Sequence, residues 1–126
     1  MHDEAVKQAL AVMDRHIEAL NARDNDKLIA TLHFPHYRLS GSDLKIWETP
    51  ERYQSDFLKR AGADWSHSAF EDIEVTGTSE NKVHLNAEIQ RFRKDGSLLT
   101  RFRSLWVITC EHDVWAAKLR STFAPL

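Results

Sequence analysis

The second half of the chain constrains the fold most, because strand-like segments and short turns follow one another there without interruption. Apolar and polar side chains alternate along residues 68–78, 82–93, 98–110 and 114–123, which is the pattern of strands with two different faces. Short polar segments separate them at residues 79–81, 94–96 and 111–113. Turns of this length connect antiparallel neighbours, so we predict four long antiparallel strands here.

The first half has the spacing of helices around one hairpin. Apolar residues three and four positions apart predict a helix over residues 4–22, and Asp24 or Asn25 caps a shorter helix that Pro35 prevents from continuing. Two short strands follow around the turn at residues 40–43, and residues 50–61 predict a third helix. Helices followed by a strongly bent antiparallel sheet indicate one α+β domain over residues 1–126, with the helices packed on one face.

Composition and charge exclude several classes of protein. The net charge of -2 provides no global field that would select nucleic acid or an anionic membrane. The apolar runs are too short to span a bilayer, and the start MHDEAVK lacks the pattern of a signal peptide. The single Cys110 fits a reducing compartment. We therefore expect a cytoplasmic protein without a membrane partner.

The order of the predicted elements, together with EALNARDNDKLIATL at residues 18–32, resembles the nuclear transport factor 2-like superfamily. The resemblance is to its ketosteroid-isomerase and polyketide-cyclase branch, and FPHYR and RSTFAP resemble a bacterial subgroup of unknown activity. It implies a cystatin-like cone in which a curved sheet wraps one long helix and leaves a pocket at the wide end. It also implies a homodimer that pairs through the convex face of the sheet.

Aligning the isomerase on ALNA at residues 19–22 tests whether its chemistry is inherited. Its oxyanion-binding tyrosine falls at His16, its proton-shuttling aspartate near Ser40 and its protonated aspartate near Ser104. A serine without a partner base cannot move protons as an aspartate does. We therefore do not expect the isomerase's reaction here.

The segment HFPHYRL at residues 33–39 carries the candidate catalytic groups. If Ser40 points inward, strand alternation also points His36 and Arg38 inward. His36 is then a candidate base and Arg38 a clamp for an anion, with His16 as the third candidate. The structural alternative is that Arg38 pairs with Glu48 or Glu88 and His36 caps a chain end.

The candidate pocket wall comes from the later strands. Trp106 shares a strand face with Ser104 and Phe102, and flat aromatic walls suit ring-shaped ligands. A three-residue turn at 94–96 would set Glu88 beside Phe102, which places the polar face of strand 82–93 in the pocket and its apolar face in the dimer contact. The predicted ligand-binding residues are Ser40, Trp47, Glu88, Phe102, Ser104 and Trp106.

Two other patterns in the sequence have simpler explanations than a metal site or a nucleic-acid contact. His33 and His36 have an H-x-x-H spacing, but Pro35 should direct the two rings apart, and we expect neither a metal nor a cofactor. Basic residues gather between positions 91 and 103, where we favour a solvated strand edge over a nucleic-acid contact.

These patterns predict a small-molecule-binding domain with a conical pocket, with a cofactor-free isomerase, lyase or cyclase reaction as its catalytic version. The alternative is a noncatalytic dimerisation or partner-binding module whose cavity is filled by side chains. Cavity volume discriminates between them, because a ligand site of the usual kind measures roughly 300 Å³ or more.

Overall fold

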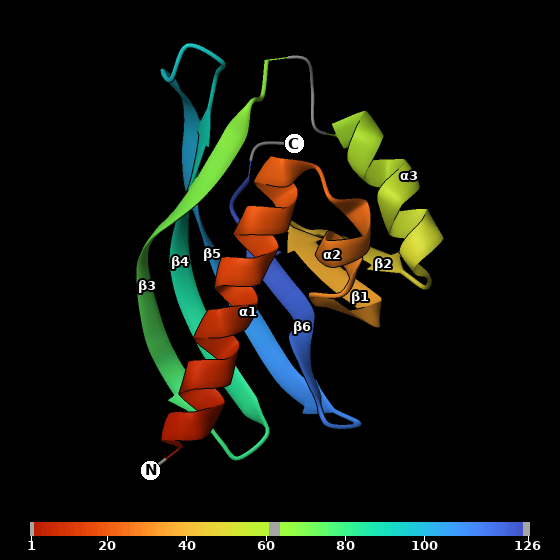
Figure 1. Ribbon diagram of the computed structural model, residues 1–126, viewed down its shortest axis with the longest axis vertical. Coiled ribbons are helices and arrows are strands. Elements are labelled where there is room, and N and C mark those ends of the chain that lie inside the picture. Colours follow the sequence, from red (N-terminus) through yellow and green to blue (C-terminus); the bar gives the residue numbers. More distant parts are fainter. Residues whose placement is uncertain (1, 61–63, 125–126) are drawn as a thin grey trace.

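The computed structural model describes residues 2–60 and 64–124 and has an α+β architecture, as predicted. The helices are α1 (Asp3–Ala22), α2 (Asn25–Ile29) and α3 (Pro50–Arg60). The strands are β1 (Leu32–Ser40), β2 (Asp43–Trp47), β3 (His67–Thr78), β4 (Lys82–Phe92), β5 (Leu98–Glu111) and β6 (Val114–Thr122). Figure 1 shows a curved sheet with α1 lying along its concave face and with α2 and α3 beside β1 and β2.

The sheet has the strand order β2-β1-β6-β5-β4-β3. Its neighbours pair antiparallel with one exception, because β1 runs parallel to β6. The predicted curved antiparallel sheet is therefore confirmed except at this pair, which is parallel. The two strands are joined by most of the chain, which is what a parallel pair requires.

α1 packs its small residues against the sheet. Its buried positions are Ala5, Ala9, Val12, Met13, His16 and Ala19, while the larger Val6, Leu10 and Ile17 of the predicted stripe are only half-buried. Alanines let a helix approach a curved sheet closely, so the larger residues flank the contact. α1 ends at Arg23, which has a positive φ of 55° and directs its N–H to the carbonyls of Ala19 and Leu20.

The segment HFPHYRL lies entirely within a strand, which corrects the prediction that its front half ends a helix. α2 is only five residues long and is capped by Asp24, whose side chain accepts a hydrogen bond from the backbone of Lys27. β1 begins at Leu32, and Pro35 lies where its register with β6 is irregular. Proline has no N–H to give a strand ladder, so a residue in this irregular stretch is where a strand tolerates it. The peptide bond between Phe34 and Pro35 is cis.

The register of β4 against β5 also differs from the prediction. Ile89 pairs with Phe102 and Ala87 with Ser104, which moves Glu88 to the opposite face beside Arg103. The shift arises at the hairpin, where the pairing steps from Arg91–Thr100 to Phe92–Leu98. A one-residue change reverses every side chain of a strand. The apolar face of β4 is therefore concave and buried under α1, and it is not available to a second subunit.

Candidate functional site

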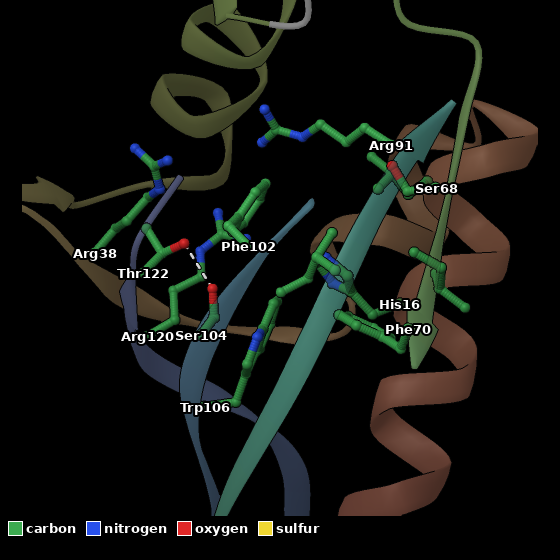
Figure 2. Close-up of a pocket in the computed structure, with 13 residues that line it drawn as sticks. His16, Arg38, Ser68, Phe70, Arg91, Phe102, Ser104, Trp106, Arg120 and Thr122 are labelled. Carbon is green, nitrogen blue, oxygen red and sulfur yellow. Dashed lines mark hydrogen bonds between the residues drawn. The ribbon is translucent and has the colours of Figure 1, made fainter. Parts of the chain in front are cut away.

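A cavity of about 70 Å³ lies between α1 and the concave face of the sheet. Figure 2 shows its lining converging from α1 and from several strands. The lining residues are His16, Ile17, Leu20, Arg38, Ser68, Phe70, Ile89, Arg91, Phe102, Ser104, Trp106, Arg120 and Thr122. Five of the predicted site residues are in this lining: His16, Arg38, Phe102, Ser104 and Trp106.

His36 points inward, as strand alternation predicted, but it lies in the core and does not line the cavity. Its side chain has an exposed fraction of 0%. The ring stacks on Trp47 at 6.1 Å between centroids and meets Tyr53 edge-on at the same distance. Nδ1 lies 3.1 Å from the carbonyl oxygen of Ala117. This placement removes His36 from reach of a ligand in the cavity.

The other predicted ligand-binding residues also lie outside the lining. Trp47 is buried in the core, and its indole N–H donates to Asp56 at 2.8 Å. The Ser40 hydroxyl is buried and donates to the carbonyl oxygen of Ala124 at 3.5 Å. Glu88 lies on the convex face, where its carboxylate accepts a hydrogen bond from Gln90 at 2.8 Å. Glu88 therefore cannot be the structural partner of Arg38 on the concave face.

His16 is the histidine that lines the cavity, and its tautomer follows from its neighbours. The Thr31 hydroxyl donates its single proton to the carbonyl oxygen of Leu28 at 2.6 Å. It can then only accept from His16 Nδ1, which lies 2.8 Å away. The lone pair of the ring is thus on Nε2. Burial, reinforced by the charge of Arg120, lowers the pKa of His16 to about 3, so the ring is neutral at physiological pH.

Aromatic side chains form the walls around His16. Trp106 meets the His16 ring edge-on at 5.0 Å, and Phe70 meets Trp106 in the same geometry at 5.5 Å. Phe102 lies at the other end of the cavity, with the Arg91 guanidinium 4.8 Å from its ring centroid. The predicted use of Trp106 and Phe102 as pocket walls agrees with this lining.

Arg120 is the functional candidate that the sequence reasoning missed most clearly. Its guanidinium lies 5.1 Å from the Trp106 ring and 6.0 Å from the Tyr53 ring, and Nη2 donates to the Tyr53 hydroxyl at 3.2 Å. Arg120 pairs with Arg38 across β6 and β1 and with Trp106 across β6 and β5. The alternation of RSTF already places Arg120 and Thr122 on one face, and this signal could have found both.

Two hydroxyls lie at the base of the cavity. Ser104 Oγ donates to Thr122 Oγ1 at 2.6 Å, and this bond is drawn in Figure 2. The backbone N–H of Ala124 donates to the same Thr122 oxygen at 3.1 Å. Both side chains are buried. Together they form a small polar floor under a lining that is otherwise mainly aromatic, aliphatic and cationic.

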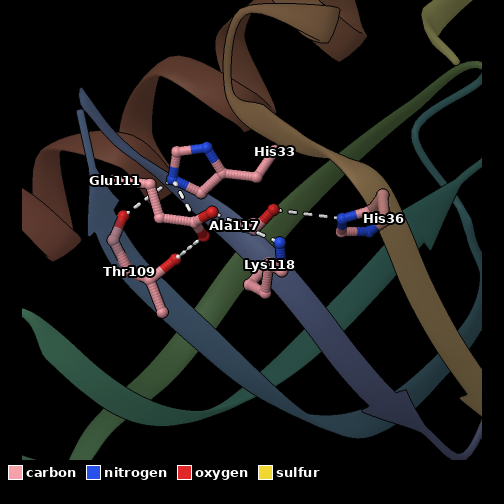
Figure 3. A network of polar contacts seen from close by, with 6 residues as sticks. All are labelled: His33, His36, Thr109, Glu111, Ala117 and Lys118. Atoms are coloured by element: carbon pink, nitrogen blue, oxygen red, sulfur yellow. Dashed lines mark hydrogen bonds and ion pairs between the residues drawn. The ribbon is translucent and has the colours of Figure 1, made fainter. Parts of the chain in front are cut away.

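A second polar cluster lies away from the cavity, around β5 and β6 (Figure 3). His33 Nε2 lies 2.9 Å from the carbonyl oxygen of Thr109 and 3.7 Å from the Glu111 carboxylate, which also contacts Lys118 at 3.3 Å. Burial raises the pKa of Glu111, but a hydrogen bond from Thr109 and the nearby His33 and Lys118 hold that pKa below its ordinary value. His33 and His36 thus contact different carbonyls. Within the described ranges no three His, Cys, Asp or Glu side chains are placed to hold a metal.

The basic residues of the β4–β5 hairpin are divided between two faces. Arg91 lines the cavity, whereas Arg103 binds Asn86 and Asp72 on the other face. Arg93 donates to Ser97 and Leu98 within the hairpin turn. Arg91, Arg93 and Arg103 therefore do not lie on one common face.

A larger hollow of about 330 Å³ lies where α1 meets α2. Its charged side chains have both signs, Arg15 and Lys27 against Glu18 and Asp24, and these are exposed or half-buried. Among the described residues, its lining includes neither an aromatic side chain nor a buried titratable group. None of the described helices is both long and apolar enough to cross a membrane.

Comparison with known proteins identifies the fold. No protein-family model matches this chain, and no curated protein matches it in sequence. Solved structures do match: an NTF2-like protein of unknown function from Pseudomonas putida has a TM-score of 0.78 at 15% identity, covering 100% of this chain and 90% of its own. A ketosteroid isomerase-like protein from Erwinia carotovora has a TM-score of 0.70 at 18% identity, and the match covers 99% of this chain and 100% of that protein. A putative polyketide cyclase from Xanthomonas campestris has a TM-score of 0.63 at 16% identity, and the match covers 94% of this chain and 91% of that protein.

Proposed function

We propose that this protein, which has the nuclear transport factor 2-like fold, binds a small molecule in the cavity between α1 and the sheet. The observation that supports this most directly is His16, a fully buried histidine whose neutral ring lines an aromatic cavity. Burying a polar ring in this way is costly unless the ring is hydrogen-bonded, and a ligand donor can bond to its Nε2. The volume of about 70 Å³ is well below the usual 300 Å³. The ligand is therefore very small, or only one end of it enters.

The lining favours binding over the proton transfer of an isomerase or cyclase. Among the described residues, those that line the cavity include no Asp or Glu. His16, with its pKa of about 3, is a weak base at neutral pH. His36, the base expected from the sequence, lies in the core. We therefore assign Arg38, Phe102, Ser104 and Trp106 to ligand contact, and we assign no general base.

The test is a fragment screen by ¹H–¹⁵N NMR spectroscopy on the wild-type chain. We expect small fragments to shift the Trp106 indole resonance, which a Trp106→Phe variant identifies. Ser104→Leu places a larger side chain in the cavity and should abolish those shifts. Ser55→Leu makes the same change at an exposed position of α3 and should preserve them. If no fragment shifts Trp106 or its neighbours in the folded protein, the proposed function is wrong.

A second candidate function, a dimerisation module, is favoured by the convex face. We define the convex patch as Tyr37, Leu39, Leu44, Ile46, Leu105 and Leu119. Register places these side chains on one face, because Tyr37 pairs with both Ile46 and Leu119 and Leu39 pairs with Leu44. Leu44 and Ile46 have exposed fractions of 61% and 46%. We propose that a second copy of the chain covers this patch, and ligand binding and dimerisation are compatible because they use opposite faces.

A cytoplasmic location completes the proposal. The single Cys110 cannot form an internal disulfide and therefore needs no oxidising compartment. Fractionation of the producing cells checks this, and recovery in a secreted or envelope fraction would contradict it.

A further inference from the structure

We propose that the ligand carries an oxyanion, a carboxylate or phosphate group, and that Arg120 binds this group with Arg38 and Arg91. This inference rests on the proposed function, because it states the chemical class of the ligand for the same cavity. It starts from the charge of the lining, whose described residues include three arginines and no acidic side chain. Figure 2 shows the three arginine side chains at the same end of the pocket.

Two of these arginines lie next to each other on adjacent strands. Arg38 and Arg120 occupy directly paired positions on β1 and β6 and both line the cavity. Like charges at directly opposite positions of adjacent strands repel one another. An anion bound between them replaces this repulsion by two attractions. An anion placed there would therefore be attracted by both guanidinium groups.

Arg120 itself has neutral partners. The Tyr53 hydroxyl accepts one of its hydrogen bonds, and the Tyr53 and Trp106 rings lie on its planar group. No ion pair joins Arg120 to a carboxylate in the described part of the chain, and its buried Nε has no hydrogen-bond partner there. A guanidinium fixed between rings still presents N–H groups in a plane that matches a carboxylate or phosphate.

The remaining polar groups of the cavity also supply donors. Trp106 Nε1 is buried and has no acceptor within the described residues. The Ser104 and Thr122 hydroxyls share one hydrogen bond, so one of their two protons remains for another acceptor. Against these donors the lining offers one ring acceptor, His16 Nε2. A ligand rich in acceptor oxygens, as an oxyanion is, would complement these donors.

The volume limits what accompanies the charged group. A water molecule occupies about 30 Å³ in the liquid, so a cavity of about 70 Å³ accommodates only a few heavy atoms. An oxyanion group fits, and the remainder of a larger ligand has to extend past Phe102 and Arg91 toward solvent. The proposal does not depend on whether a carbon or a phosphorus atom carries the oxygens.

The test compares charged and neutral molecules of the same shape. Each molecule is titrated separately into the protein at constant ionic strength. Acetate is compared with acetamide and benzoate with benzamide, and inorganic phosphate is titrated as a third anion. The Trp106 indole ¹H–¹⁵N resonance reports occupancy at the cavity. We expect benzoate to bind at least about tenfold more tightly than benzamide, and Trp106 to move downfield as its N–H gains an acceptor. Preference for phosphate over both carboxylates would identify a phosphate group as the anion and would support the same proposal.

Arginine variants show which side chain provides the positive charge that binds the anion. Arg120→Gln should remove the preference for benzoate over benzamide, and Arg120→Lys should retain part of it because the charge stays while the planar geometry is lost. The matched control is Arg101→Gln, at an exposed position of β5 outside the cavity lining, which should bind benzoate as the wild type does. If Arg120→Gln does not give the spectrum of a folded protein, Arg38→Gln replaces it.

The outcomes separate this inference from the proposed function. If benzamide binds in the cavity as tightly as benzoate, the cavity binds ligands but the anion proposal is wrong. The anion proposal is also wrong if Arg101→Gln loses as much affinity as Arg120→Gln, because the effect is then general surface charge. If neither these molecules nor any fragment shifts Trp106, both proposals are wrong.

Discussion

At the scale of single residues, His16 couples the stability of the protein to pH. Burial, with the charge of Arg120 as the second cause, lowers its pKa from 6.5 to about 3. Above pH 6.5 the ring is neutral in both the folded and the unfolded state. Between pH 6.5 and about 3 the unfolded chain binds a proton at His16 that the folded protein excludes. Stability from this residue is therefore present above pH 6.5 and is lost as the pH falls toward 3.

We expect the free energy of unfolding to fall in this range by up to about 1.4 kcal/mol per pH unit because of His16. Urea unfolding of the wild type and of His16→Asn at several pH values between 7 and about 4 measures it, because only the wild type carries this contribution. His112→Asn is the control, since His112 is exposed in the β5–β6 turn and has a positive φ that asparagine tolerates. If the free energy of unfolding changes equally with pH in the wild type and in His16→Asn, the prediction is wrong.

At the scale of the elements, one asparagine joins α1 to β3. Asn21 Nδ2 donates to the Ser68 carbonyl oxygen, and the Ser68 N–H donates to Asn21 Oδ1, both at 2.8 Å. The Ser68 hydroxyl accepts in turn from the Trp65 indole at 2.8 Å. This reciprocal pair positions the start of β3 against the end of α1, and Ser68 is part of the cavity wall.

Asn21→Ala should lower the free energy of unfolding by about 1–3 kcal/mol, because it leaves a half-buried backbone donor and acceptor without partners. Gln8→Ala is the matched control on α1, where an exposed side-chain bond to Glu4 is lost, and it should change stability by less than about 0.5 kcal/mol. Chemical denaturation of the three proteins measures both values. An Asn21→Ala protein as stable as the control would show that the junction contributes nothing.

The local spacing of apolar residues was enough to predict the helices and strands. Which side chains meet in the cavity depends instead on the pairing of strands that are far apart in the sequence. Alternation in β5 was enough to place Phe102, Ser104 and Trp106 on one face, because it needs no knowledge of neighbouring strands. Arg120 was missed because β6 has an irregularity between its pairing of Ala117 and Leu119. Its position beside Arg38 also depends on a parallel pairing between distant segments. Glu88 was misplaced because a hairpin's register depends on an irregularity that the turn sequence does not reveal.

At the scale of the whole molecule, the convex patch predicts the oligomeric state. A stable interface buries about 800 Å² on each partner, and the convex patch presents apolar side chains of β1 and β2, three of them exposed, without a helix over them in the described part of the chain. Light scattering at micromolar concentration should give about twice the chain mass of 14.6 kDa. Ile46→Lys places a charge in the patch and should give the monomer mass.

Val75→Lys is the control for this substitution. Val75 is also an exposed β-branched residue, with an exposed fraction of 42%, but it lies on β3 at the far edge of the sheet. The variant should remain a dimer. A wild-type chain that scatters as a monomer at this concentration would sink the dimer proposal and leave ligand binding untouched.

The central position of β6 has a consequence for the order in which this protein is built. β1 and β2 reach the remainder of the sheet only through β6, since the order is β2-β1-β6-β5-β4-β3. During synthesis the β1–β2 hairpin is made early and must wait for residues 114–122 to leave the ribosome before its inner edge is paired. Contacts between such distant segments slow folding. The cavity, which needs Arg38 from β1 and Arg120 from β6, can thus form only after residues 114–122 have been made and have paired with β1.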